Sequence, residues 1–248
     1  MFHRRKGLSE DWARVAESSL AWWGSFSADE QAQLADIADW LLRHKHWEAA
    51  HGFELSDEIL TVLALSAAVL VLGLDTDYYR EVSAIVVFPT TIMSRGEYAG
   101  PVRGTVTDGV VPVLGQAHDR RGAILIAWDE ARDAARNPGH GRNVVFHEFA
   151  HKLDMLDDVT DGTPPLPKEQ MARWVAVCTE AYESLQSGAA RPPLDPYGAT
   201  NPAEFFAVAT EAFFDAPVAL RTNEPDVYEV LAAFYNQDPA VRSRRAPS

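Results

Sequence analysis

Two histidines and a glutamate lie within five residues of each other in NVVFHEFAHKLDML, residues 143–156. An α-helix turns by about 100° per residue, so His147 and His151 project from one face, one turn apart. Two imidazoles in this arrangement suit a shared zinc ion. Glu148 points about 100° away from His147, where it could act as a general base toward a water molecule at the metal. The stretch therefore predicts the active-site helix of a zinc hydrolase.

A second interpretation of this stretch is a buried helix whose polar groups are satisfied by the core. The pattern H-E-x-x-H arises by chance in on the order of one percent of chains this long, so it needs support. Asn143 is a favourable N-cap, and apolar residues fill most of the other positions. Polar groups in such surroundings are costly unless paired or metal-bound, which favours zinc. Asp154, three residues after His151, could orient that histidine.

A hydrolytic zinc site of this type needs a third protein ligand and keeps one position open. No histidine follows His151, so we expect a carboxylate. The helix predicted to begin near Pro202, in NPAEFFAVATEAFFDAP, carries Glu204 and Glu211 on one face among apolar residues. We prefer Glu211 as the ligand, because Asp215 follows it by one turn and could hold a ligand histidine. Glu204 is the alternative, and would otherwise lie near the metal or the substrate.

Tyr197 lies in the loop sequence DPYGATNP, just ahead of this helix. Its phenol could donate a hydrogen bond to the oxyanion of a tetrahedral intermediate. A packing role explains a tyrosine at this position equally well. Tyr197 is therefore a second candidate catalytic residue beside Glu148.

The composition limits the classes of partner. The chain has 248 residues, 47% of them apolar, and a formal net charge of −14. This acidic balance argues against a nucleic-acid backbone or an anionic membrane as main partner. The single cysteine, Cys178, allows neither an intramolecular disulfide nor a thiolate zinc cluster. We interpret it as a buried structural thiol, so a metal must bind His, Asp or Glu.

The longest apolar run covers residues 59–74 and is shorter than the roughly 20 residues of a membrane span. Ser56 could cap it, so we predict a buried core helix. The basic N-terminus has no apolar stretch behind it and is not typical of a secretory signal. We therefore expect a cytoplasmic location.

The elements that must position the candidate site form an α+β pattern. Residues 1–80 are predicted to form an N-terminal helical region packed on a catalytic region of residues 81–248, in one compact domain overall. Short β-branched segments predict a small sheet of three or four strands, at residues 82–89, 102–107, 110–116 and 122–128. Helices are predicted after the sheet, at residues 128–137, 143–156, 168–186, 202–217 and 226–237.

Several stretches between residues 45 and 239 together resemble the Mlc titration factor A family, the glucose-regulated bacterial zinc peptidases. They are KHWEAAHGFELSDEI, LVLGLDTDYY, HEFAHKLD, YGATNPAEFFAV with EAFFDAP, and FYNQDP, and they keep this order along the chain. The set covers most of the chain and is much more specific than the zinc motif alone.

The resemblance implies a zincin-like fold and a gluzincin-type site with one zinc ion per chain. It implies His147, His151 and Glu211 as ligands and Glu148 as the base. It also implies similarity to the catalytic domain of anthrax lethal factor, and aminopeptidase activity on peptide substrates. The enterobacterial member of the family binds the glucose repressor Mlc. No segment of this sequence indicates a surface for a transcriptional repressor, so that partner rests on the resemblance.

Three functions compete for these residues. A zinc-dependent peptidase is preferred, with the strand at residues 122–128 as a candidate to align an extended peptide by edge pairing. The alternative is a regulatory protein that sequesters a transcription factor and keeps residual peptidase activity, but such a protein would not need Glu148. A zinc-stabilised structural domain would need a closed site of four ligands, and the sequence offers three good ones.

Overall fold

The structure, a computed structural model, describes residues 7–50, 52–90, 122–157 and 159–243. The elements follow in this order: α1 Trp12–Ser19, η1 Trp23–Ser25, α2 Ala28–His44, β1 His46–Ala49, α3 Asp57–Val71, η2 Thr76–Tyr79, β2 Ala84–Phe88, β3 Ala123–Ala127, α4 Trp128–Arg136, α5 Val144–Asp154, η4 Met155–Asp157, α6 Lys168–Gln186, η5 Pro196–Ala199, α7 Pro202–Asp215, α8 Pro217–Asn223, α9 Pro225–Tyr235 and α10 Pro239–Arg242. The described chain is therefore mainly helical, with a small sheet whose strands lie between residues 46 and 127.

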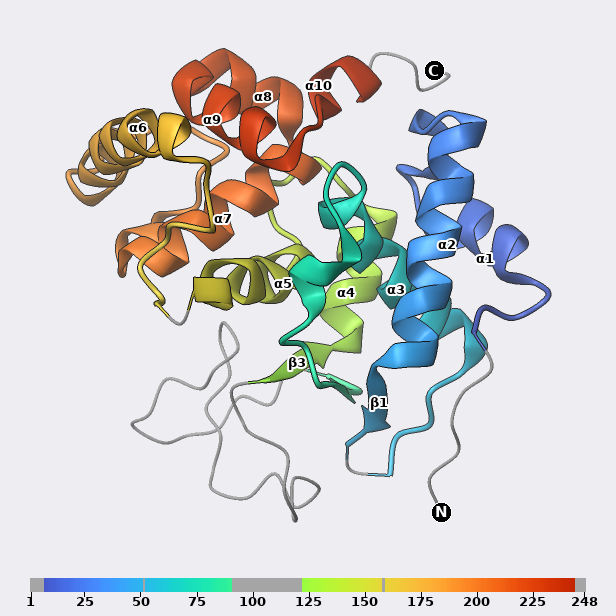
Figure 1. The fold of residues 1–248 in the computed structure, drawn as a ribbon. Helices are drawn as coiled ribbons and strands as arrows, with labels where there is room; N and C mark the ends of the chain where they lie inside the picture. Colours follow the sequence, from blue (N-terminus) through green and yellow to red (C-terminus); the bar gives the residue numbers. More distant parts are fainter. Residues whose placement is uncertain (1–6, 51, 91–121, 158, 244–248) are drawn as a thin grey trace.

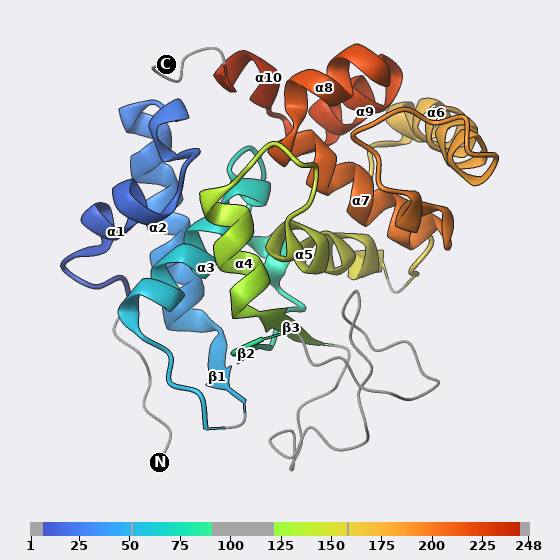
Figure 2. The same ribbon diagram turned by 180° about the vertical axis from the view of Figure 1, so that it is seen from behind.

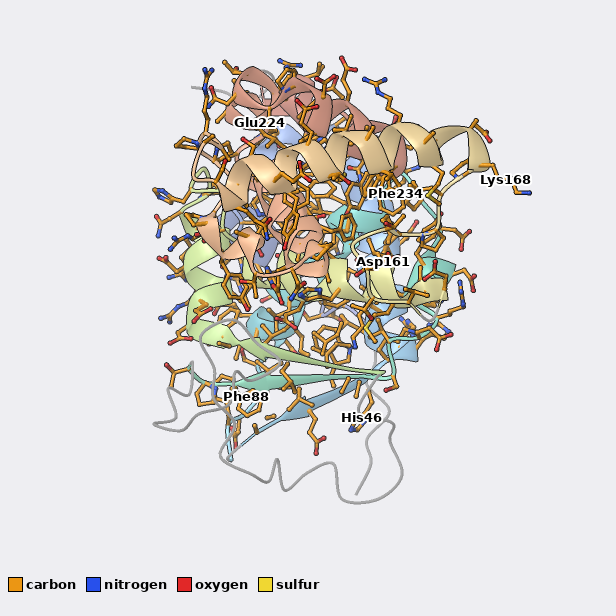
Figure 3. All side chains as sticks on the ribbon, turned by 90° about the vertical axis from the view of Figure 1, so that its left-hand side faces the viewer. His46, Phe88, Asp161, Lys168, Glu224 and Phe234 are labelled. Atoms are coloured by element: carbon orange, nitrogen blue, oxygen red, sulfur yellow. The ribbon has the colours of Figure 1, made fainter. Side chains whose placement is uncertain are left out.

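The described residues form a three-stranded parallel sheet in the order β1-β2-β3. Residue Ala84 of β2 pairs with His46 on one side and Ala123 on the other. The central strand β2 is buried, which explains its unbroken apolar sequence AIVVF. Figure 3 shows the strands side by side at one end of the molecule, with the described helices stacked above them. This arrangement confirms the predicted α+β class.

The strands test the sequence-based prediction directly. The segments predicted at residues 82–89 and 122–128 are confirmed as β2 and β3. Those predicted at residues 102–107 and 110–116 lie outside the described residues. Residues 46–49 fall in the region of residues 1–80 that was predicted to be helical, and for these four residues the prediction was wrong, because they form the strand β1 and pair with β2. Trp47 in this strand is buried, and its indole nitrogen donates a hydrogen bond to the carbonyl of Leu41 at 3.3 Å.

The helix α3 is the buried core helix predicted from the apolar run. The side chain of Ser56 accepts a hydrogen bond from the backbone N–H of Ile59, as expected of an N-cap. Every residue from Ile59 to Val71 is buried. Among the described residues, no helix combines the length and the apolar character needed to cross a bilayer. The helix thus serves as a central packing element, in contact with α1, α2 and α5.

The helix α5 lies between the sheet and a group of later helices (Figures 1 and 2). It contacts β3 on one side and α7 on the other. The aromatic rings of Trp174, Phe206 and Phe234 meet edge to face and join α6, α7 and α9 above it. The two helices with candidate ligands are therefore neighbours, and both are held by packing on their outer sides.

Candidate metal centre

The N-terminus of α5 is fixed by Asn143, as its sequence predicted. The side-chain oxygen of Asn143 accepts hydrogen bonds from the backbone N–H groups of Val145 and Phe146, at 3.0 and 3.2 Å. Apolar side chains bury the helix on nearly all sides, including Phe149, which packs edge to face on Tyr79. A helix held in this way gives its polar side chains well-defined directions.

His147 and His151 converge, as expected for residues four positions apart on one helix. Their Nε2 atoms lie 3.2 Å from each other. The side chain of His147 is 4% exposed and that of His151 is 18% exposed. One side of the pair is therefore reachable from solvent.

The carboxylate that faces both Nε2 atoms belongs to Glu204, in the first turn of α7. Its Oε2 atom lies 3.1 Å from Nε2 of His147 and 3.6 Å from Nε2 of His151. One ligand atom from each of these three residues lies within 4.8 Å of the others. Two imidazole nitrogens and one carboxylate oxygen are a typical ligand set of catalytic zinc, which leaves a fourth position for water or substrate. The donor set therefore fits the predicted metal.

Glu211 contacts the opposite edge of the His147 ring. Its Oε1 atom lies 2.7 Å from Nδ1 of His147, and its Oε2 atom accepts a hydrogen bond of 2.6 Å from the backbone N–H of Asn143. Both carboxylate oxygens are thus engaged away from the two Nε2 atoms. The geometry favours Glu204 as the third ligand, over the Glu211 that the sequence pattern favoured.

Asp215, expected to hold a ligand histidine, contacts the loop before α5 instead. Its Oδ2 atom accepts hydrogen bonds from the backbone N–H groups of Gly139, Gly141 and Arg142, at 3.0, 2.6 and 3.4 Å. Burial raises the pKa of Asp215, and these N–H groups oppose that shift. Gly141 has a φ of +69°, and a Cβ there would lie 2.8 Å from the carbonyl oxygen of Pro193. The loop therefore requires both its glycine and its carboxylate.

Glu148 lies beside the candidate ligands in a buried position. Its Oε1 atom has no hydrogen-bond partner among the described residues. Burial raises the pKa of Glu148 to about 8, and the nearby charge of His147 opposes this shift. A carboxylate with a pKa near neutrality suits proton transfer at physiological pH. The environment of Glu148 therefore suits a group that accepts and releases a proton near neutral pH.

The charges around His147 show why the site would attract a cation. Burial alone lowers the pKa of His147, but the carboxylates of Glu204 and Glu211 outweigh it and raise the pKa to about 10. Burial raises the pKa of Glu204, but its contacts with the imidazoles of His147 and His151 lower it to about 2. The cluster thus stabilises positive charge between carboxylates, and a divalent metal would replace protons there.

Tyr197 lies close to the site, in the 3-10 turn η5. Its ring centroid is 6.2 Å from that of His147. The turn is held by Asp195, whose Oδ1 atom accepts a hydrogen bond from the backbone N–H of Tyr197 at 2.8 Å. Arg142 forms an ion pair of 2.5 Å with the other oxygen of Asp195. This pair was not predicted from the sequence, although the aspartate of D-P-Y is typical of the start of a turn.

Asp154 is fully buried at the end of α5 and faces the loop that follows. Burial raises its pKa to about 6, with smaller contributions from Asp161 and Asp157, while the backbone N–H groups of Gly162 and Thr163 lower it. The groups that shift this pKa all follow α5 in the chain, so the carboxyl group of Asp154 faces the segment after the helix. The expectation that Asp154 orients His151 stays a prediction.

A cavity of about 650 Å³ lies next to the candidate metal centre. His147 and Glu211 line it on one side, and Glu130 and Asp133 of α4 line it on another. Neither His151 nor Glu204 lines the cavity, so it lies on the Glu211 side of the His147 ring.

A histidine pair on one helix and a glutamate from a second helix, beside a small sheet, define the class as a zincin-like metallopeptidase fold. The chain belongs to the family of glucose-regulated metallo-peptidases M90, whose model matches residues 2–236. The resemblance inferred from the motifs is thereby confirmed.

Similar proteins match nearly the whole chain. An uncharacterized protein of Synechocystis sp. is 31% identical over 241 residues, which cover 96% of this chain and 87% of that protein. Mlc titration factor A of Serratia proteamaculans is 33% identical over 222 residues, covering 87% and 83%. The protein of the same name from Escherichia fergusonii is 30% identical over 230 residues, covering 90% and 85%.

Proposed function

We propose that this protein is a zinc-dependent peptidase that hydrolyses peptide bonds in an aminopeptidase-like manner. The observation that carries the proposal is the convergence of His147, His151 and Glu204 next to the buried carboxylate of Glu148. The two Nε2 atoms and the Oε2 atom would hold the zinc ion. Family membership supports the same class of reaction.

The chain's own residues supply the proton transfers and the binding contacts. Zinc in this site would act as a Lewis acid and lower the pKa of water. Glu148 would take a proton from the attacking water and pass it to the leaving amine, and its raised pKa suits both transfers. The phenol of Tyr197 would donate a hydrogen bond to the oxyanion of the tetrahedral intermediate, which its position beside His147 supports.

The strand β3 supports the proposed alignment of an extended substrate. Among the described residues, β3 pairs with β2 alone, so one of its edges has no described partner. A peptide pairing with that edge would lie near α5, which contacts β3. Peptides N-methylated at single positions test this idea. A raised KM for alternate positions is expected, whereas equal KM values at all positions would contradict strand pairing.

The proposed activity is tested by metal analysis and peptide hydrolysis on the wild type and Glu148→Gln. We expect one zinc ion per chain in both proteins, and a loss of roughly 10²- to 10⁴-fold in kcat for the variant. Unchanged hydrolysis with bound zinc would show that Glu148 is not the base. Absence of stoichiometric zinc from the wild type would reject the metal centre itself. Comparing free with N-acetylated peptides distinguishes aminopeptidase from endopeptidase action.

A second candidate function is the sequestration of a transcriptional repressor. The observation that favours it is the name Mlc titration factor A, carried by relatives that match most of this chain. Affinity purification of the tagged protein from its native host would test it. A transcriptional repressor retained equally by wild type and Glu148→Gln supports this function, whereas its absence from both contradicts it.

A further inference from the structure

Glu211 is a buried carboxylate for which the proposed mechanism has no role. Its side chain is 3% exposed, although an ionised carboxylate is costly to bury without partners. One oxygen contacts Nδ1 of His147 and the other accepts from the backbone N–H of Asn143. Glu211 thus contacts both a candidate ligand and the residue that caps the same helix.

Both partners of Glu211 are hydrogen-bond donors in the proposed site, so each of them needs an acceptor. A neutral imidazole that binds a metal through Nε2 carries its proton on Nδ1, so Nδ1 of His147 must be a donor. The backbone N–H of Asn143 is a donor under all conditions. A carboxylate offers an acceptor oxygen to each of them, whereas a glutamine of the same shape offers one oxygen and one NH₂ group. Glutamine at this position would leave one donor facing another.

We propose that Glu211 is a positioning residue, which fixes the tautomer and the ring direction of His147 and ties both to the first turn of α5. The inference rests on the proposed metal centre. It assigns Glu211 a role distinct from that of Glu204, which lies on the Nε2 edge of the same ring. Asn143 extends the connection, because its side chain caps the helix that carries His147.

The test compares zinc affinity in wild type, Glu211→Gln, Glu211→Ala and the control Glu183→Gln, an exposed glutamate of α6. Competition with a coloured zinc chelator gives the affinity, and urea unfolding of the metal-free proteins gives their stability. We expect affinity losses of about 10- to 100-fold for both Glu211 variants and none for the control. A merely structural role predicts that the isosteric glutamine restores the affinity that alanine loses.

Nitrogen NMR of the zinc-loaded proteins gives an independent readout. We expect the proton of His147 on Nδ1 in the wild type, and a changed Nδ1 signal in Glu211→Gln. Wild-type zinc affinity with an unchanged signal in folded Glu211→Gln would overturn the inference while leaving the metal centre intact. Failure of the wild type to bind zinc would overturn both, so the two failures are distinguishable.

Discussion

Glu204 and Glu211 lie on one face of α7 but contact opposite edges of the same imidazole ring. Glu204 lies 3.1 Å from Nε2 of His147, and Glu211 lies 2.7 Å from its Nδ1. Seven residues of helix separate the two glutamates by about 10.5 Å along the axis. The ring of His147 bridges this interval, so one helix supplies both a candidate ligand and the carboxylate that holds another ligand.

The assignment of Glu204 as a ligand predicts a strong effect of Glu204→Ala on metal binding. We expect zinc affinity to fall by more than the roughly 100-fold upper range for residues that act through a ligand. Equilibrium dialysis against zinc buffers measures it, with Glu211→Ala in parallel. A larger loss in Glu211→Ala, with near-normal affinity in Glu204→Ala, would restore Glu211 as the ligand.

The position of Tyr197 predicts a selective effect on catalysis. Tyr197→Phe should lower kcat by roughly 10²- to 10³-fold, the range seen when one oxyanion donor is removed. Zinc content should stay at the wild-type level, because the phenol is outside the proposed ligand set. Tyr78→Phe is the control, because Tyr78 packs on Phe234 and is not part of the proposed site. Equal kcat values for wild type and Tyr197→Phe would support a packing role.

The hydrogen bonds that Asp215 accepts from the loop before α5 predict a loss of stability when this residue is replaced. Asp215→Ala leaves the backbone N–H groups of Gly139, Gly141 and Arg142 without their acceptor. Only the hydrogen bond from Gly141 is buried, because Gly139 and Arg142 are exposed. Leaving one buried donor unsatisfied costs about 1–3 kcal/mol, so we expect a decrease of about 1–3 kcal/mol in the free energy of unfolding. Urea denaturation of the metal-free protein measures it. A change below about 0.5 kcal/mol, typical of surface substitutions, would contradict a stabilising role for these hydrogen bonds.

The raised pKa of Asp154 predicts how the free energy of unfolding depends on pH. Its folded-state pKa is raised from 3.8 to about 6, so the folded protein holds this proton more tightly than the unfolded chain. The stabilisation is present below pH 3.8 and is lost as pH rises through about 6. Two pKa units correspond to about 3 kcal/mol.

Asp154→Asn removes this titration. The difference in unfolding free energy between variant and wild type should therefore change by about 2 kcal/mol between pH 4 and 6.5, in favour of the variant at the higher pH. Urea unfolding of both metal-free proteins across this range measures the difference. A difference that is independent of pH would show that Asp154 does not titrate in this window.

Local sequence was sufficient for the helix that carries the histidines. The four-residue spacing of His147 and His151, the cap at Asn143 and the apolar flanks each act within one helix, so they can be interpreted without knowing the fold. The buried helix α3 was predictable for the same reason, because its unbroken apolar sequence requires burial on all sides.

Tertiary structure decided what depends on segments far apart in the sequence. Residues 46–49 form a strand because β2 pairs with them, and no local pattern shows that partner. The choice between Glu204 and Glu211 depends on how far α7 is shifted along α5, since both glutamates occupy the same face. That shift is set by the packing of α7 against α5 and the outer helices, and it places Glu204 at the Nε2 atoms and Glu211 at Nδ1.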